Sequence, residues 1–125
     1  MTDSVDRLHE AVLAAKHADP AQSRTARLLR AGRSKIAKKL GEEAVEVVID
    51  AMHGNREAVV RESADLIYNL SVLWVSLGVM PKDVWKEMDR RERLFGIAEK
   101  LLKDRDLRAR QTLAASAMRR ARRRQ

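Results

Sequence analysis

Cysteine is absent from this sequence of 125 residues, and aromatic side chains are scarce. Without cysteine the chain has no disulfide, no thiolate metal site and no cysteine nucleophile. The only aromatic rings belong to Tyr68, Trp74, Trp85 and Phe95, so aliphatic side chains must supply most of the core. Composition therefore excludes disulfide scaffolds and thiolate-zinc modules, and it fits a reducing cytoplasm.

Long apolar runs, strand signals and glycine-rich phosphate loops are also missing. No apolar run approaches the length of a membrane span, and residues 1–10 lack the hydrophobic region of a signal peptide, so we expect a soluble, cytoplasmic protein that does not bind membranes. No segment alternates between apolar and polar residues, which predicts an all-α fold. Because the GxGxxG and GxxxxGK[ST] loops are absent, a bound nucleotide must be held by metal, lysine and arginine.

The excess positive charge lies at the C-terminal end. The net charge is +8, and residues 100–125 contain ten Lys or Arg and two Asp, so the rest of the chain is neutral. We predict a domain over residues 1–98 and a basic extension over residues 99–125, helical or partly disordered, whose arginine block frays through like-charge repulsion. The extension has no aromatic ring to stack on a base, which favours a solubilising role over nucleic-acid binding.

Apolar periodicity and capping residues predict five helices. Their expected bounds are residues 4–16, a short helix from Ser23 or Arg24 to Gly32, a long helix that Ser34 caps and Gly54 ends, residues 56–77, and a last helix opened by Pro81. The link around Gly54 and Asn55 is short enough to fold the two long helices into an antiparallel hairpin.

Two acidic stripes occupy the long helices. Each helix carries two acids three residues apart: Glu43 and Glu46 on the first, Glu62 and Asp65 on the second. In a hairpin the two stripes meet, and closely placed carboxylates are costly unless a cation lies between them. An oxygen-only cluster suits Mg²⁺ or Mn²⁺. The alternative is a solvated acidic face, but the adjoining valines and leucines should be buried, and paired i, i+3 carboxylates hold divalent metals in helical bundles.

Several polar residues near the acids are candidates for substrate contacts. Lys39 lies one turn before Glu43, where it can contact a metal-held phosphate or form an i, i+4 salt bridge with Glu43. Arg33 and Lys35 flank a predicted helix start whose amides can bind phosphate, although both also suit an ordinary surface. Glu42 lies beside the acidic stripe, where either it or one of the carboxylates in the stripe can orient or deprotonate a water molecule.

The sequence around these acids resembles that of the phosphoribosyl-ATP pyrophosphatase family. This family belongs to the all-α nucleotide pyrophosphohydrolases, which also include MazG-type enzymes. The similar segments are Ser23-x-Thr25-Ala26-x-Leu28-Leu29, Gly32, Lys39-x-Gly41-Glu42-Glu43-Ala44-x-Glu46 and Glu62-x-Ala64-Asp65-Leu66-x-Tyr68. The similarity runs from about residue 8 to residue 91. One departure is Asn69, where the family usually has histidine.

The resemblance implies Mg²⁺-dependent hydrolysis of phosphoribosyl-ATP to phosphoribosyl-AMP and pyrophosphate in histidine biosynthesis. It implies four metal ligands, Glu43, Glu46, Glu62 and Asp65. We assign catalytic roles to Glu42 and Lys39, and substrate binding to Arg33, Lys35, Lys39 and Asn69. The large apolar area of the two long helices predicts that two hairpins pair as a four-helix core, in a homodimer or a higher even oligomer.

Two other functions remain open at the level of sequence. Asn69 leaves room for a (deoxy)nucleoside triphosphate as the substrate, as in MazG-type house-cleaning enzymes. The basic extension leaves room for a helical module without catalytic activity that binds nucleic acid.

Overall fold

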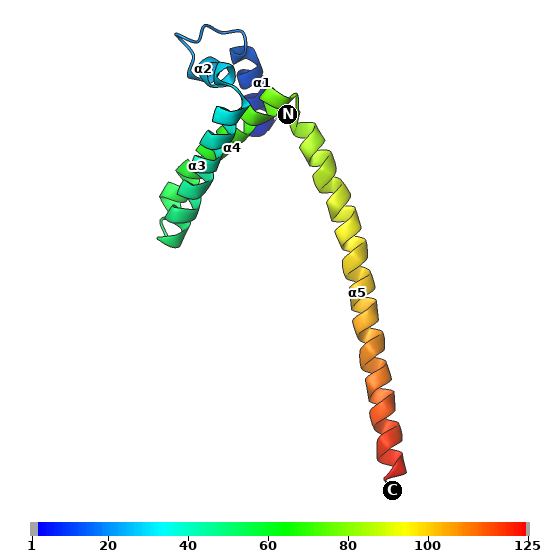
Figure 1. The fold of residues 1–125 in the computed structure, drawn as a ribbon. Helices are drawn as coiled ribbons and strands as arrows, with labels where there is room; N and C mark the ends of the chain where they lie inside the picture. Colours follow the sequence, from blue (N-terminus) through cyan, green and yellow to red (C-terminus); the bar gives the residue numbers. More distant parts are fainter. Residues whose placement is uncertain (1–2, 125) are drawn as a thin grey trace. The chain divides into compact units, whose positions relative to one another are not determined.

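The computed structural model describes residues 3–96 and 102–124, which are helical or in turns and contain no strand. The all-α prediction is therefore confirmed for this part of the chain (Figure 1). Contacts along the chain define two units, residues 1–84 and residues 85–125, and each is described by itself. The predicted boundary between residues 98 and 99 falls outside the described residues.

The helices are α1 (Ser4–Ala15), α2 (Arg24–Ala31), α3 (Arg33–Met52), α4 (Arg56–Leu77) and α5 (Pro81–Arg123). Side-chain oxygens cap three of them. Asp3, Ser23 and Asn55 accept hydrogen bonds from the backbone N–H groups three residues later, at 2.8, 3.1 and 3.2 Å. Gly78 ends α4 in the left-handed conformation, with a φ of 70°. The predicted helices are therefore confirmed.

One predicted cap is wrong. Ser34 was expected to cap α3, but the helix begins at Arg33 and Gly32 is its N-cap, without a side-chain cap bond. Gly32 has a φ of 95°, a conformation that side-chain-bearing residues rarely adopt. This one glycine ends α2 and starts α3, so Ser34 lies inside the first turn.

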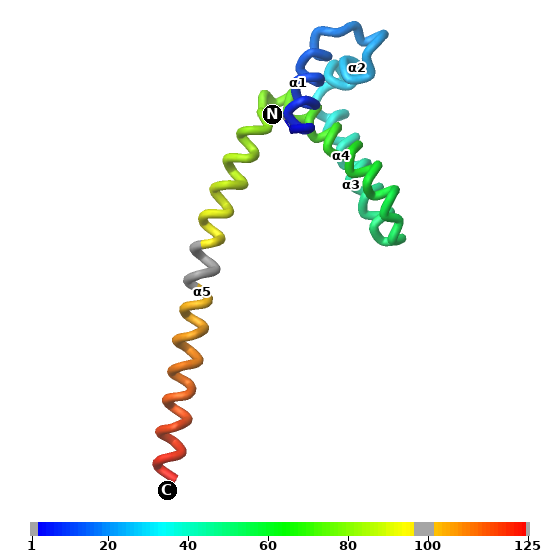
Figure 2. Tube along the Cα trace, turned by 180° about the vertical axis from the view of Figure 1, so that it is seen from behind, coloured from blue at the N-terminus to red at the C-terminus, as the bar shows by residue number. Residues whose placement is uncertain are grey.

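The first unit is a hairpin of α3 and α4 with two shorter helices at one end. The two long helices lie side by side in both views (Figures 1 and 2). Helix α1 packs against α4, and α2 packs against α3 and α4. They cover the end where α3 begins and α4 finishes, and there the core forms from Val12, Ile36, Val72 and Val75. The carboxylate-bearing turns follow directly along the hairpin.

Helix α5 continues through the basic extension as far as Arg123. The helical alternative for the extension is the one seen there, and the fraying of the arginine block stays a prediction. Arginine and alanine have high helix propensity, and cations are favourable near a helix C-terminus, where the macrodipole is negative. Near its start, α5 carries surface ion pairs of Glu87 with Arg90 and Arg91, at 2.7 and 3.1 Å.

A search for membrane-spanning segments covers the part of the chain that the structure describes. No single helix there is long and apolar enough to cross a bilayer. Helix α4 taken with residues 81–96 passes the same test only as a bent pair, on length and composition.

Candidate metal centre

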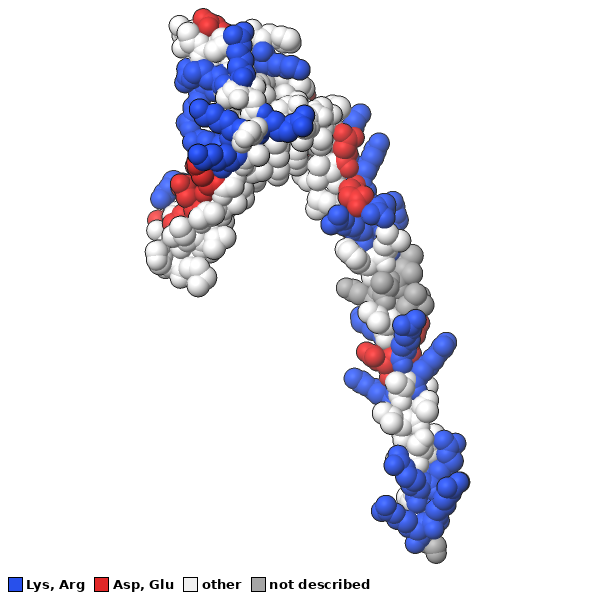
Figure 3. Space-filling model, in the orientation of Figure 1, with Lys and Arg blue, Asp and Glu red and all other residues white. Residues whose placement is uncertain are grey.

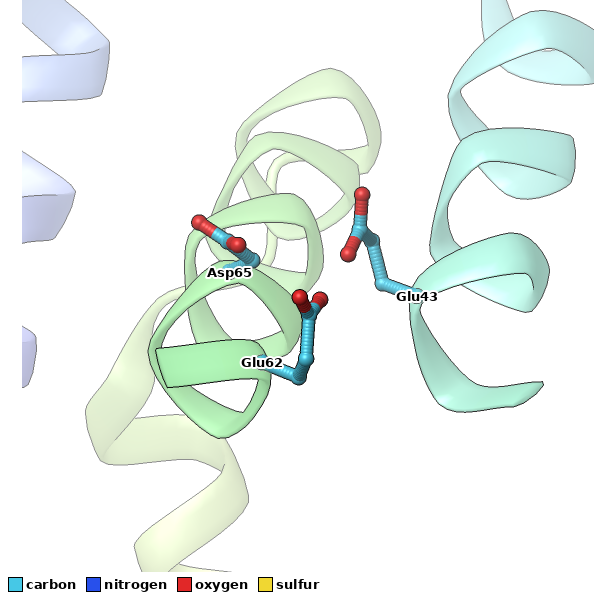
Figure 4. Close-up of side chains that lie close together, drawn as sticks. All are labelled: Glu43, Glu62 and Asp65. Carbon is cyan, nitrogen blue, oxygen red and sulfur yellow. The ribbon is translucent and has the colours of Figure 1, made fainter. Parts of the chain in front are cut away.

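Three carboxylates from the hairpin converge on one point. Glu43 projects from α3, and Glu62 and Asp65 project from α4; one oxygen from each lies within 4.8 Å of the others (Figure 4). Local sequence explains the arrangement, because residues three apart share a helix face and the short link brings that face against α3. The predicted meeting of the two acidic stripes is thus observed for these three residues.

The cluster is short of hydrogen-bond donors. Glu43 and Glu62 are partly buried, and Oε2 of each is buried without a hydrogen-bond partner among the described residues. An ionised carboxylate only accepts hydrogen bonds, so these oxygens cannot satisfy one another. A divalent cation bound by oxygen ligands would satisfy them and offset the repulsion.

Crowding raises the pKa of Glu62 from 4.5 to about 7. The largest cause is a side-chain hydrogen bond with Glu46, followed by burial, a hydrogen bond with Glu43 and the charges of both neighbours. Protonation of Glu62 removes one negative charge from the crowded group. The effect on this pKa indicates that Glu46 lies near Glu62, although Glu46 is exposed and outside the group of three.

The donor set fits a hard divalent cation. Three of the four predicted ligands meet, and the fourth, Glu46, is near enough to raise the pKa of Glu62. Carboxylate oxygens are the ligands that Mg²⁺ and Mn²⁺ accept, and nitrogen or sulfur ligands are absent from the cluster. Glu42 is exposed on the turn that carries Glu43. The arrangement can hold a metal ion that in turn binds a polyphosphate.

The predicted phosphate-binding residues fall into two different pockets. Lys35 and Lys39 line a groove of about 310 Å³ between α2 and α3. Arg33 lines a separate pocket of about 400 Å³ on another side of α2. The alternative salt bridge between Lys39 and Glu43 does not form among the described residues.

Two groove residues were not among the sequence candidates. Arg24 and Arg27 lie three residues apart on α2 and line the groove that contains Lys35 and Lys39. The i, i+3 spacing was a sequence signal that both share a helix face. Which face of α3 they meet depends on tertiary packing, which the spacing does not give.

Asn69 lies one turn after Asp65, as predicted, and is only 3% exposed. Its Nδ2 donates a hydrogen bond to the backbone oxygen of Asp65 at 2.8 Å. Its Oδ1 is buried and has no partner within the described segments. The predicted substrate contact of Asn69 therefore stays a prediction, and this hydrogen bond ties the residue to the acid-bearing turn.

Comparison with known proteins identifies a family. Residues 5–92 match the phosphoribosyl-ATP pyrophosphohydrolase family. The chain is 70% identical over 105 residues to phosphoribosyl-ATP pyrophosphatase 2 of Rhodopseudomonas palustris. The aligned residues are 84% of this chain and 80% of the relative. It is 68% identical to the protein of the same name in Bradyrhizobium diazoefficiens, over 82% of this chain and 77% of the relative. It is 52% identical to phosphoribosyl-ATP pyrophosphatase of Gluconobacter oxydans, over 77% of this chain and 72% of the relative.

Proposed function

Because the chain belongs to the phosphoribosyl-ATP pyrophosphohydrolase family, we propose that it hydrolyses phosphoribosyl-ATP to phosphoribosyl-AMP and pyrophosphate. The observation that carries the proposal is the convergence of Glu43, Glu62 and Asp65 in a cluster short of hydrogen-bond donors. Such a cluster suits the metal complex of a polyphosphate better than a neutral substrate. The reaction would be a cytoplasmic step of histidine biosynthesis.

The metal would be Mg²⁺, with Mn²⁺ as the alternative, held by Glu43, Glu46, Glu62 and Asp65. When bound, such an ion neutralises phosphate charge and lowers the pKa of a coordinated water molecule. The buried oxygens of Glu43 and Glu62 support this ligand set, because the protein offers them no donor among its described residues.

The remaining residues act on the water molecule and the substrate. Attack of water on the α-phosphorus forms one P–O bond and breaks the bond to the bridging oxygen, which leaves with pyrophosphate. Glu42 accepts the proton of the attacking water. Lys39, one turn from Glu43 and without an ion pair to it, stabilises charge on the equatorial oxygens. Lys35, Arg33 and Asn69 contact other parts of the substrate.

The proposed active form is a homodimer or a higher even oligomer in which two hairpins pack as a four-helix core. Its support is the exposure of large apolar side chains along the hairpin, namely Val45, Val48, Ile49 and Met52 on α3, and Val60 and Ile67 on α4. Isolated exposed apolar residues are ordinary, but a continuous set along two packed helices marks an interaction surface.

The decisive measurement is pyrophosphate release from phosphoribosyl-ATP by the purified chain, with Mg²⁺ and with a chelator in its place. We expect turnover that depends on the metal. A panel of deoxynucleoside triphosphates tests the second candidate substrate class, which the Asn69 departure leaves open. Faster turnover of the panel than of phosphoribosyl-ATP would reassign the substrate. Truncation after Lys103 should leave hydrolysis intact. Loss of activity in the truncated chain would mean that the function depends on the basic extension.

A further inference from the structure

The groove between α2 and α3 is lined by four cations. They are Arg24, Arg27, Lys35 and Lys39, with Leu28 and Ala31 as its apolar part. Among the described residues, no carboxylate forms an ion pair with any of the four. Figure 3 shows Lys and Arg side chains gathered over α2 and the first turns of α3, and acidic side chains on the turns that follow.

Four unpaired cations around one groove repel one another, so the groove favours an anion. A phosphate monoester carries a charge of about −1.5 to −2 at pH 7, with three acceptor oxygens. Arginine presents a planar fork of donors that matches such oxygens, and lysine adds a point charge. The hydrogen bond of 2.9 Å from Arg27 Nη1 to the backbone oxygen of Pro20 holds that side chain in place.

A nucleic-acid backbone fits this place poorly. A polyanion that continues along α3 from Lys39 meets Glu42, Glu43 and Glu46 within the next two turns. Like charges at that distance repel it unless a metal ion intervenes. The groove also has the volume of a small-molecule pocket, about 310 Å³. A single terminal phosphate fits both features.

The proposed substrate has anionic groups at both ends. The triphosphate is attached to one ribose, and a phosphate monoester is attached to the second ribose on the purine. Lys35 and Glu43 are eight residues apart on α3, which is about 12 Å along the helix axis. A purine nucleotide that carries a second ribose can span this length.

We infer that the Arg24–Arg27–Lys35 groove binds the phosphate monoester of the phosphoribosyl group while the acid cluster holds the triphosphate. This inference rests on the proposed function and assigns the groove as the element that selects phosphoribosyl-ATP over ATP. ATP has the same triphosphate but lacks the phosphoribosyl group whose phosphate would bind in the groove. The groove contributes to substrate binding and takes no part in breaking the phosphoanhydride.

The test is to compare Arg24→Gln, Lys35→Gln and the double variant with the wild type on phosphoribosyl-ATP and on ATP. Both residues are exposed, so the variants should fold, and circular dichroism melting checks this. Loss of charged hydrogen bonds should raise KM for phosphoribosyl-ATP by about 10- to 100-fold while kcat stays within about twofold. The preference for phosphoribosyl-ATP over ATP, measured as the ratio of their kcat/KM values, should fall by the same factor. The matched control is Lys82→Gln, which removes one positive charge from an exposed site outside the groove.

Binding of ribose 5-phosphate gives a readout that does not need catalysis. The wild type should bind ribose 5-phosphate and not ribose, and the double variant should lose this binding, as measured by NMR titration. Equal losses for ATP and phosphoribosyl-ATP, an unchanged KM in the double variant, or no ribose 5-phosphate binding would overturn the inference. Failure of the proposed function itself is separate, since the wild type would then release no pyrophosphate from phosphoribosyl-ATP.

Discussion

The hydroxyl groups of Thr25 on α2 and Tyr68 on α4 lie 2.5 Å apart and share a hydrogen bond. These residues belong to two sequence segments that are 43 positions apart and that both resemble family motifs. The bond joins α2, which carries Arg24 and Arg27, to α4, which carries Glu62 and Asp65. It therefore connects the helix that lines the cationic groove with a helix that contributes to the acid cluster.

Removal of either hydroxyl should destabilise the protein. Tyr68→Phe or Thr25→Val leaves a partly buried hydroxyl without its partner, at a cost of about 0.5–1.5 kcal/mol in the free energy of unfolding. The double variant should cost less than the sum of the two, because one bond is lost in all three proteins. Urea unfolding of the four proteins measures this coupling. Additive costs would mean that the two hydroxyls do not stabilise each other.

Neutral substitutions in the acid cluster should abolish turnover without unfolding the chain. Glu46→Gln or Asp65→Asn weakens the metal site, and we expect activity to fall by at least about 100-fold. Melting of the metal-free protein should stay level or rise, since a negative charge leaves a crowded site. Glu10→Gln, an exposed acid on α1, is the control. A sharply lower melting temperature with full activity per folded molecule would make the acids structural.

Glu62 should make the metal-free protein less stable as the pH rises. Its pKa is about 7 in the folded chain, against an ordinary value of 4.5, so the folded state holds the proton more tightly than the unfolded chain does. The stabilisation is complete below the unfolded pKa, declines once the unfolded chain releases its proton, and is lost as the pH passes the folded value. Melting temperatures with chelator, across this range, measure the effect. Glu62→Gln should reduce the fall in melting temperature with rising pH. If the wild type and the variant give parallel curves, the pH dependence does not come from Glu62.

The helices and the acid cluster could be predicted because both depend on local features. Caps such as Asn55, the i, i+3 spacing of Glu62 and Asp65, and the short link determine the hairpin without distant contacts. The family expected from the motifs is confirmed by the match over residues 5–92.

The groove could not be predicted because it depends on how α2 packs on α3. Because α3 starts at Arg33, that residue and Lys35 point to nearly opposite sides of the helix, about 160° apart, and they line different pockets. With Ser34 as the expected N-cap, Arg33 would lie before the helix, so the sequence did not indicate that the two side chains point to different sides. Arg24 and Arg27 join the site only through tertiary packing.

Asn69→His introduces the residue that the family resemblance leads us to expect at this position, and it should leave an active enzyme. Histidine titrates near pH 6.5 and asparagine does not, so the pH profile of kcat should gain or shift an inflection near neutrality. The buried position beside the backbone of Asp65 brings such a charge close to the acids. Asn69→Ala is the control for packing, because alanine cannot titrate. Kinetics of Asn69→His that match the wild type at every pH would place the side chain away from the chemistry.

Association should depend on the apolar surface at the free end of the hairpin. Ile36 is fully buried in the chain's own core, whereas Met52 is 81% exposed and Val48 is 59% exposed, so only the latter two are available to a second copy. Val48→Glu with Met52→Glu should convert a dimer into a monomer in light scattering at micromolar concentration, because burying a charge in an apolar interface is costly. Leu107→Glu, on an exposed part of α5, is the matched control and should leave the oligomer intact. A monodisperse, active wild-type monomer would rule out the four-helix core.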